Sequence, residues 1–244
     1  QVQLLADAGH TRTHQPPAYH YCSWYDKRAE YTMEDLTALL DWIDDNPEGL
    51  QTIQIDAGHS VTGDWLIPRT QYWPDGMKAA AEAIQAKGLR AGIWIGPFMV
   101  NDGSEVYKNH QDWLLRDLDG NTIKKGQNWG PGGERTDTYV LDTSHPDAFE
   151  HIRNVFATLH EWGFTFYKTD FMDWGFFDST LVKRYTPGKT SAQYYNEMIA
   201  AIREAIGEES YWLGCIAYFA PMAGYVDGIR TTSDVGESWT KREP

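Results

Sequence analysis

The segment PDAFEHIRNVFATLHEWGFTFYKTD, residues 146–170, places a helix pattern directly before a strand pattern. Pro146–Trp162 carries apolar residues at spacings of three and four, and Gly163 marks the end of the expected helix. Phe164–Asp170 is a nearly continuous apolar run, which is typical of a strand buried on both faces. A helix that leads straight into a buried strand indicates an alternating α/β fold.

The same alternation extends along most of the chain. Further helical patterns occupy Thr32–Asp45, Asp75–Lys87 and Ser191–Ile206. Further strand-like runs, which bring the expected strands to six, occur at Ala18–Trp24, Leu50–Asp56, Leu89–Phe98, Tyr211–Tyr218 and Tyr225–Asp234. Residues 1–17 lack this periodicity, so we expect a lead-in or linker there and one domain over residues 18–244.

An alternating α/β pattern fits either an open doubly wound sheet or a (β/α)8 TIM barrel. The chain has no glycine-rich GxGxxG fingerprint after its first strand, which disfavours the open sheet. A complete barrel needs eight strands, so the sequence predicts a TIM barrel truncated after strand six. We expect the missing strands to come from the rest of a longer polypeptide.

One long insert, Met99–Ser144, separates the third strand from the next helix. The Asp119-Gly120 turn and the Gly126–Gly133 stretch suggest a loop that contains a short hairpin. Long loops inside compact domains are usually functional, so we expect the insert to lie over the mouth of an active site.

Composition excludes several classes of partner. The 244 residues include 35 acidic and 21 basic side chains, a net charge of −14 that repels nucleic acid and anionic membranes. No apolar run of about 18 residues and no signal-peptide pattern occurs, so no membrane span is expected. No cofactor or metal motif is present. Cytoplasmic and secreted locations, and a homo-oligomeric state, stay open.

Three carboxylates close the even-numbered strands. Asp56, Asp170 and Asp234 end the second, fourth and sixth runs, and in a barrel these positions share one layer at the carboxyl ends of the strands. Lys168 is expected to lower the pKa of Asp170 and keep it ionised, as a nucleophile requires. Burial beside the loop Val235–Trp239 is expected to raise the pKa of Asp234, as a general acid requires. For any single Asp, a helix cap or turn is the alternative.

Two carboxylates in different protonation states, flanked by aromatic rings, are what retaining glycoside hydrolysis needs. The odd-numbered strands supply Trp24, Trp94 and Cys215. Indole rings stack on the apolar face of a sugar, although packing in the barrel core is the alternative for both tryptophans.

Short motifs along residues 18–239 resemble the α-galactosidases of glycoside hydrolase family 36, whose clan includes family 27. The motifs follow the family's order. They are Tyr21-Cys22-Ser23-Trp24-Tyr25, Ile53-Gln54-Ile55-Asp56, Gly63-Asp64-Trp65, Pro74-Asp75-Gly76-Met77, Gly92-Ile93-Trp94, Tyr167-Lys168-Thr169-Asp170, Leu213-Gly214-Cys215 and Arg230-Thr231-Thr232-Ser233-Asp234-Val235.

The resemblance implies hydrolysis of terminal α-galactosides in glycosides or oligosaccharides, with Asp170 as nucleophile and Asp234 as acid/base. It also implies a set of residues that contact the sugar: Lys168 and Arg230 at hydroxyls, Trp24 and Trp94 as walls, Asp56 near C4 and C6, Cys215 near C2, and Trp65 and Trp174 as further candidates.

Two departures from the family leave the sugar open. The family usually has two adjacent aspartates at the second strand, whereas Asp56 is followed here by Ala57. The small residues usual after Cys215 are replaced by the bulkier run 216–219, which would alter the C2 or leaving-group side. The β-domains that flank the barrel in the family are absent from this sequence.

Three alternatives therefore stay open. In the first alternative, the same mechanism acts on another sugar, such as an α-N-acetylgalactosaminide or a β-L-arabinopyranoside. Alternatively, the chain is a carbohydrate-binding fragment without turnover. In the third alternative, Asp56, Asp170, Asp234 and His59 hold a divalent metal, although Lys168 and Arg230 would then crowd a cation.

Overall fold

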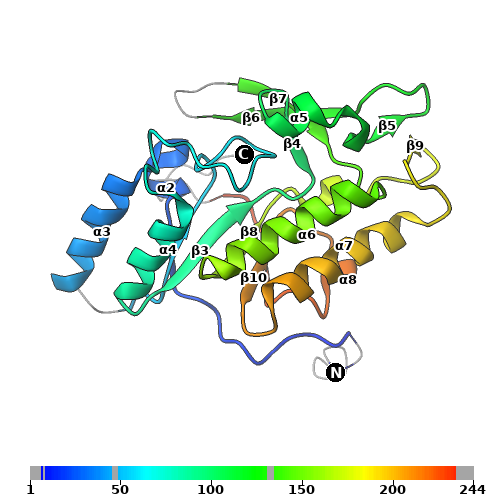
Figure 1. The fold of residues 1–244 in the computed structure, drawn as a ribbon. Helices are drawn as coiled ribbons and strands as arrows, with labels where there is room; N and C mark the ends of the chain where they lie inside the picture. Colours follow the sequence, from blue (N-terminus) through cyan, green and yellow to red (C-terminus); the bar gives the residue numbers. More distant parts are fainter. Residues whose placement is uncertain (1–6, 8, 46–48, 131–134, 235–244) are drawn as a thin grey trace.

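The computed structural model describes residue 7 and residues 9–45, 49–130 and 135–234. Its centre is a curled sheet of six parallel strands (Figure 1). Their order in the sheet equals their order in the chain: β1 (His20–Cys22), β2 (Thr52–Ile55), β3 (Arg90–Ile95), β8 (Phe164–Thr169), β10 (Tyr211–Gly214) and β11 (Gly228–Ile229). A doubly wound sheet reverses its strand order at a switch point, so the observed order is that of a barrel wall.

All six expected strands are present, and each ends earlier than its apolar run. The largest difference is in the sixth, where β11 ends at Ile229, five residues before Asp234. Within the described residues the sheet does not close, and β1 and β11 form its two edges. The fold is thus an α/β fold with a six-stranded partial barrel.

Four long helices cover the outer face of this sheet (Figure 1). They match the four expected helices and are α3 (Met33–Asp45), α4 (Gly76–Ala86), α6 (Pro146–Glu161) and α7 (Ser191–Ile206). A capping box between Thr190 and Gln193 starts α7, and Gly207 ends it with a positive φ of 73°. No helix in the described part of the chain is both long and apolar enough to cross a membrane.

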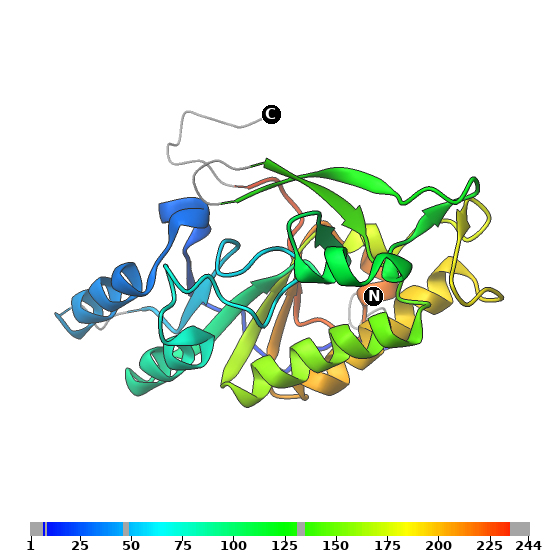
Figure 2. The same cartoon turned by 45° about the horizontal axis from the view of Figure 1, so that its top comes forward.

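The insert forms a second layer above the carboxyl ends of the strands, as Figure 2 shows. The expected hairpin is present as β6 (Lys124–Trp129) and β7 (Arg135–Val140), and β4 (Met99–Asn101) extends it to three antiparallel strands. The insert also contains α5 (Glu105–Asn109), η2 (Gln111–Trp113) and β5 (Arg116–Asp117), which pairs with β9 (Val182–Lys183).

One carboxylate joins the insert to the barrel wall. Asp64, in the loop after β2, accepts hydrogen bonds from the backbone N–H groups of Glu105 at 2.8 Å and Val106 at 3.1 Å. The Asn101 N–H also donates to the Thr62 carbonyl at 2.9 Å. The bonds to Asp64 satisfy the first two N–H groups of α5, whose N-cap Ser104 accepts from the Tyr107 N–H, and all of them tie the insert to the loop after β2.

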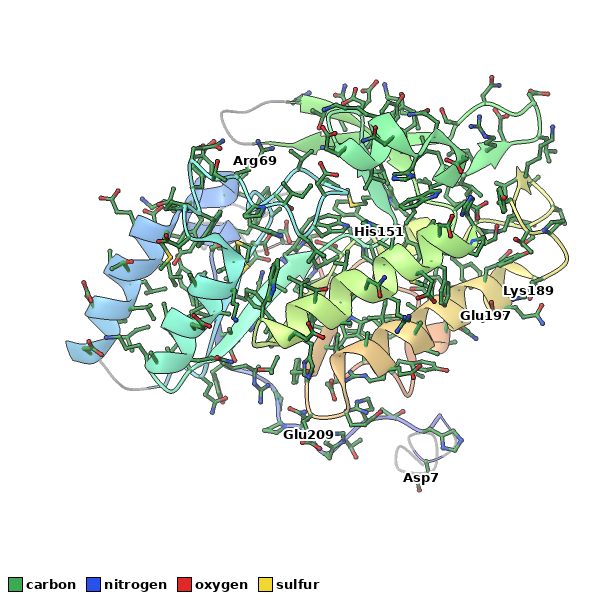
Figure 3. The ribbon with its side chains drawn as sticks, viewed as in Figure 1. Asp7, Arg69, His151, Lys189, Glu197 and Glu209 are labelled. Atoms are coloured by element: carbon green, nitrogen blue, oxygen red, sulfur yellow. The ribbon has the colours of Figure 1, made fainter. Side chains whose placement is uncertain are left out.

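The segment before β1 runs along the opposite, amino-terminal end of the sheet (Figure 1). Arg12 Nε donates to Asp227 Oδ1 at 2.9 Å, and Gln15 donates to the carbonyl of Glu209, which is labelled in Figure 3. Residues 9–17 are therefore docked on the domain rather than separate from it.

Four short helical turns complete the fold near the strand ends. They are α2 (Trp24–Lys27), η1 (Arg28–Glu30), η4 (Met172–Gly175) and α8 (Phe219–Met222).

Candidate active site

Two of the three expected carboxylates come directly after their strands. Asp56 follows β2 and Asp170 follows β8, and their exposed fractions are only 3% and 8%. Because parallel strands end at the same edge, both side chains lie beneath the insert. Side chains from this edge are drawn in Figure 3, where the labelled Arg69 marks the loop that follows β2.

Asp56 and Lys168 form a buried ion pair. Lys168 Nζ lies 2.8 Å from Asp56 Oδ2, and Gln54 Nε2 donates to the same oxygen at 2.9 Å. Burial alone would raise the pKa of Asp56, but Lys168 and these hydrogen bonds lower it. Burial alone would lower the pKa of Lys168, and the Asp56 charge raises it instead. The pair therefore holds two opposite charges in the barrel interior.

The expectation that the pKa of Asp170 is lowered is wrong, although Lys168 does act in that direction. Burial raises the pKa of Asp170, and it outweighs the lowering effects of Lys168, the Phe171 N–H, Arg230 and Trp94. The reason is geometric, since the ammonium of Lys168 binds Asp56 and the chain turns at Phe171, which has a positive φ of 52°. Asp170 accepts from the Phe171 N–H at 2.9 Å and from Trp94 Nε1 at 3.3 Å.

Arg230 connects the other two carboxylates. Its guanidinium lies 3.9 Å from Asp170 Oδ1 and forms an ion pair with Asp234 Oδ1. Asp234 also accepts from the Tyr25 hydroxyl at 3.2 Å. Two carboxylates on either side of one guanidinium are thus brought together at the strand ends.

The burial expected for Asp234 is not observed. Its side chain is 40% exposed, because it stands on a loop well past the end of β11 rather than at a strand end. The expected partner Trp239 lies outside the described residues, as does the rest of the loop Val235–Trp239.

The tryptophans differ in their positions. Trp94 and Trp65 are 3% and 2% exposed, and their rings pack edge to face with centroids 5.7 Å apart. Trp65 is therefore linked to the site by its contact with Trp94. Trp24 starts α2 and is partly exposed beneath the Arg28 guanidinium, 5.3 Å from its ring centroid. Trp174 lies in η4, 5.3 Å from the ammonium of Lys125 of the insert.

Both cysteines lie at this end of the barrel and are buried. Cys22, which sequence reasoning did not single out, donates to Asp56 Oδ2 at 3.3 Å. The register between β1 and β2 brings it there, because Cys22 pairs with Gln54, which also binds Asp56. Burial raises the pKa of Cys22 and of Cys215 to about 12, so both are thiols.

The position next to Asp56 is apolar. Ala57 is 8% exposed and belongs to the hydrophobic core, and Gly58 lies so close to Ala29 that a Cβ would sit 2.4 Å from its carbonyl oxygen. His59 is 2% exposed, and burial lowers its pKa to about 4. The metal alternative gains no support. No group of three potential metal ligands occurs among the described residues, and Asp56 already forms an ion pair with Lys168.

Two strained turns meet at this edge. Phe171 after Asp170 and Ile216 after Cys215 both have positive φ, at 52° and 46°. The Asp173 N–H donates to the Ile216 carbonyl at 2.9 Å, which ties one turn to the other. Strain of this kind in non-glycine residues is concentrated at functional sites.

The chain is similar to known proteins in sequence and in fold. The Melibiase family model matches residues 23–191. The α-galactosidase AgaA of Geobacillus stearothermophilus is 31% identical over 97 residues, which cover 40% of this chain and 12% of that protein. Escherichia coli α-galactosidase is 29% identical over 100 residues, which cover 41% of this chain and 13% of that protein.

A solved structure matches almost the entire chain. TtGalA, an α-galactosidase from Thermus thermophilus in complex with stachyose, superposes with a TM-score of 0.81 and 30% sequence identity over 98% of this chain. The match covers 49% of the Thermus chain, so the present chain spans about half of that protein. Because the family model matches more than half of its residues, the chain belongs to the Melibiase family, with the catalytic-domain fold of the family 36 α-galactosidases.

Proposed function

We propose that the chain carries the catalytic residues of a retaining α-galactosidase. The observation that carries the proposal is the arrangement of Asp170 and Asp234 around the Arg230 guanidinium at the carboxyl ends of the strands. Two neighbouring carboxylates at that end of a barrel are what double displacement at an anomeric carbon needs. The relatives named α-galactosidases, and the stachyose bound to the Thermus protein, support an α-galactoside as the substrate.

The reaction proceeds in two steps. In the first, Asp170 attacks the anomeric carbon while the bond to the leaving oxygen breaks and Asp234 gives that oxygen a proton. In the second, Asp234 takes a proton from water, the water oxygen attacks the anomeric carbon, and the Asp170 carboxylate leaves. Two inversions return the α-anomer.

The raised pKa of Asp170 suits this role. A carboxylate that is poorly solvated has little hydration to lose when it attacks carbon. The Phe171 N–H and the Trp94 indole N–H hold its two oxygens in fixed directions. Both bonds also restrain the departing carboxylate in the second step.

The remaining site residues bind the sugar in this proposal. Asp56 and Lys168 present an acceptor and a donor to hydroxyl groups, and Arg230 contacts the sugar from the other side. Trp24 and Trp94 form walls, Trp65 supports Trp94, and Cys215 faces C2. Because Ala57 stands in place of a second aspartate, the proposal also includes substrates with sugars of similar shape, namely α-N-acetylgalactosaminides and β-L-arabinopyranosides.

The proposal treats residues 18–244 as part of a (β/α)8 barrel, with residues 1–17 as its lead-in. The partial match to the Thermus chain supports two further βα units from the same polypeptide that close the sheet between β11 and β1.

A panel of nitrophenyl glycosides, assayed with the complete protein and with or without a chelator, tests the activity. We expect turnover of the α-galactoside, no effect of the chelator, and α-galactose as the first product seen by NMR. Release of β-galactose would contradict retention. Sugar binding without turnover of any glycoside would favour the non-catalytic alternative, and a loss of turnover on chelation would favour a metal site.

A further inference from the structure

Beside the paired carboxylates the surface is hollowed. The hollow has a volume of about 440 Å³ and is lined by residues 216–219 from the segment after β10, by Arg230–Thr232, and by Asp173. Arg230 is thus shared between the hollow and the carboxylate pair. A group attached to the anomeric carbon would extend past Asp234 into this space.

The wall after β10 is apolar and exposed. Ile216, Tyr218 and Phe219 are 43%, 49% and 62% exposed, although each is a large hydrophobic side chain. Scattered apolar residues on a surface need no explanation, but three that line one hollow next to a reaction centre form a binding surface.

This wall is held rigidly. The left-handed turn at Ile216 is fixed by the Asp173 N–H, and the Tyr218 ring packs on Phe176 with centroids 5.2 Å apart. α8 is anchored by Met222, which is fully buried and accepts a hydrogen bond from Tyr195 through its sulfur at 3.3 Å. A rigid apolar wall loses little conformational entropy when it binds a ligand.

Three polar side chains of the hollow bind partners within the protein. Arg230 binds Asp234, and Asp173 Oδ2 binds Lys125 of the insert at 2.8 Å, while Asp173 Oδ1 has no hydrogen-bond partner but is buried away from the hollow's surface. Thr232 donates to a backbone carbonyl at 3.3 Å. A ring with many hydroxyl groups would therefore find few free partners, whereas an apolar ring would bury the exposed side chains.

We propose that this hollow is a leaving-group subsite for a flat apolar aglycone, so that the enzyme prefers aryl or arylalkyl α-galactosides to α-galactosides of a second sugar. The inference rests on the proposed α-galactosidase activity. Ile216, Tyr218 and Phe219 are then the residues that determine which leaving group is accepted.

The test compares two substrates with similar chemistry and different leaving groups. 2-Phenylethyl α-galactoside and galactosyl-α-1,6-glucose both release a primary alcohol, so a difference in kcat/KM reports binding of the leaving group. α-Galactosyl fluoride, whose leaving group is too small to fill the hollow, reports the proposed hydrolysis separately. If the protein does not hydrolyse the fluoride, the proposed function is rejected. If it does, the other two substrates test the subsite independently of that function.

In the complete wild-type protein we expect kcat/KM to be about tenfold or more higher for the phenylethyl substrate, the size expected for partial burial of one ring. Phe219→Ser should lower that ratio about tenfold, and Phe219→Leu, which keeps apolar area, should lower it less. Tyr19→Ser removes an aromatic ring that is 71% exposed at the amino-terminal end of the barrel and should leave the ratio unchanged. An equal or higher value for the disaccharide, or a ratio that Phe219→Ser does not change, would overturn the proposal.

Discussion

The buried carboxylate of Asp170 costs the fold stability. Because burial disfavours the charged form, the pKa of Asp170 is raised from its ordinary value near 3.8. Above the raised pKa the group is ionised in both the folded and the unfolded chain, and the folded chain bears the full penalty. Below the ordinary value both forms are neutral and the penalty disappears. Active sites typically contain residues that lower the stability of the fold in this way.

Asp170→Asn should therefore raise the melting temperature near pH 7, and this gain should shrink as the pH falls through the raised pKa and be lost below about 3.8. Thermal unfolding followed by circular dichroism between pH 7 and pH 3 measures both effects. Asp41→Asn, at an exposed position of α3, serves as the control and should show no such pH-dependent gain. A variant less stable than wild type at pH 7 would contradict the account.

Lys168 stabilises the fold, whereas the buried charge of Asp170 destabilises it. Lys168→Met would leave Asp56 charged and buried without its partner, which typically costs about 3–5 kcal/mol. Urea unfolding of the variant measures the loss, and the double variant Lys168→Met/Asp56→Asn should recover most of it. Lys78→Met removes an exposed pair with Glu82 and should cost less than about 1 kcal/mol. Equal losses for the two single variants would argue against a buried pair.

The sequence predicted Asp56 and Asp170 correctly as residues at strand ends, because an apolar run that stops at an aspartate is a local signal. It did not predict which carboxylate Lys168 binds. That choice depends on the register between strands and on the turn at Phe171, and neither can be seen from spacing along one strand.

Among the larger elements, the insert is tied to the barrel through Asp64. Asp64→Ala would leave the N–H groups of Glu105 and Val106 without their acceptor at the start of α5. A loss of about 1–2 kcal/mol is expected, as for other helix caps. Chemical denaturation measures it, and Asp64→Asn, which keeps one acceptor oxygen, should lose less. If alanine and asparagine have equal effects, the carboxylate is not acting as a cap.

Helices and strands were predicted well because their periodicity is local, whereas strand ends were placed too late. The runs Tyr211–Tyr218 and Tyr225–Asp234 contain β10 and β11, but their later residues leave the sheet. Residues 216–219 line the hollow beside the site, and an apolar run cannot distinguish such a surface from a buried strand.

The molecule as a whole has two open sheet edges within the described residues, at β1 and β11. Parallel sheets need both faces covered, and unpaired edges favour association. We expect the 244-residue chain, produced alone, to unfold without a cooperative transition or to aggregate, and to have little activity. Size-exclusion chromatography and calorimetry check this expectation, and a stable monomer with a sharp transition would contradict it.

Replacement of the proposed nucleophile in the complete protein is the most direct measurement. Asp170→Gly should abolish nearly all hydrolysis of α-galactosyl fluoride, and azide should restore turnover by entering the vacated face and giving β-galactosyl azide. Asp234→Gly should instead give the α-azide, because Asp170 still forms the covalent intermediate. If Asp170→Gly is not rescued, or if Asp234→Gly yields the β-azide, Asp170 is not the nucleophile.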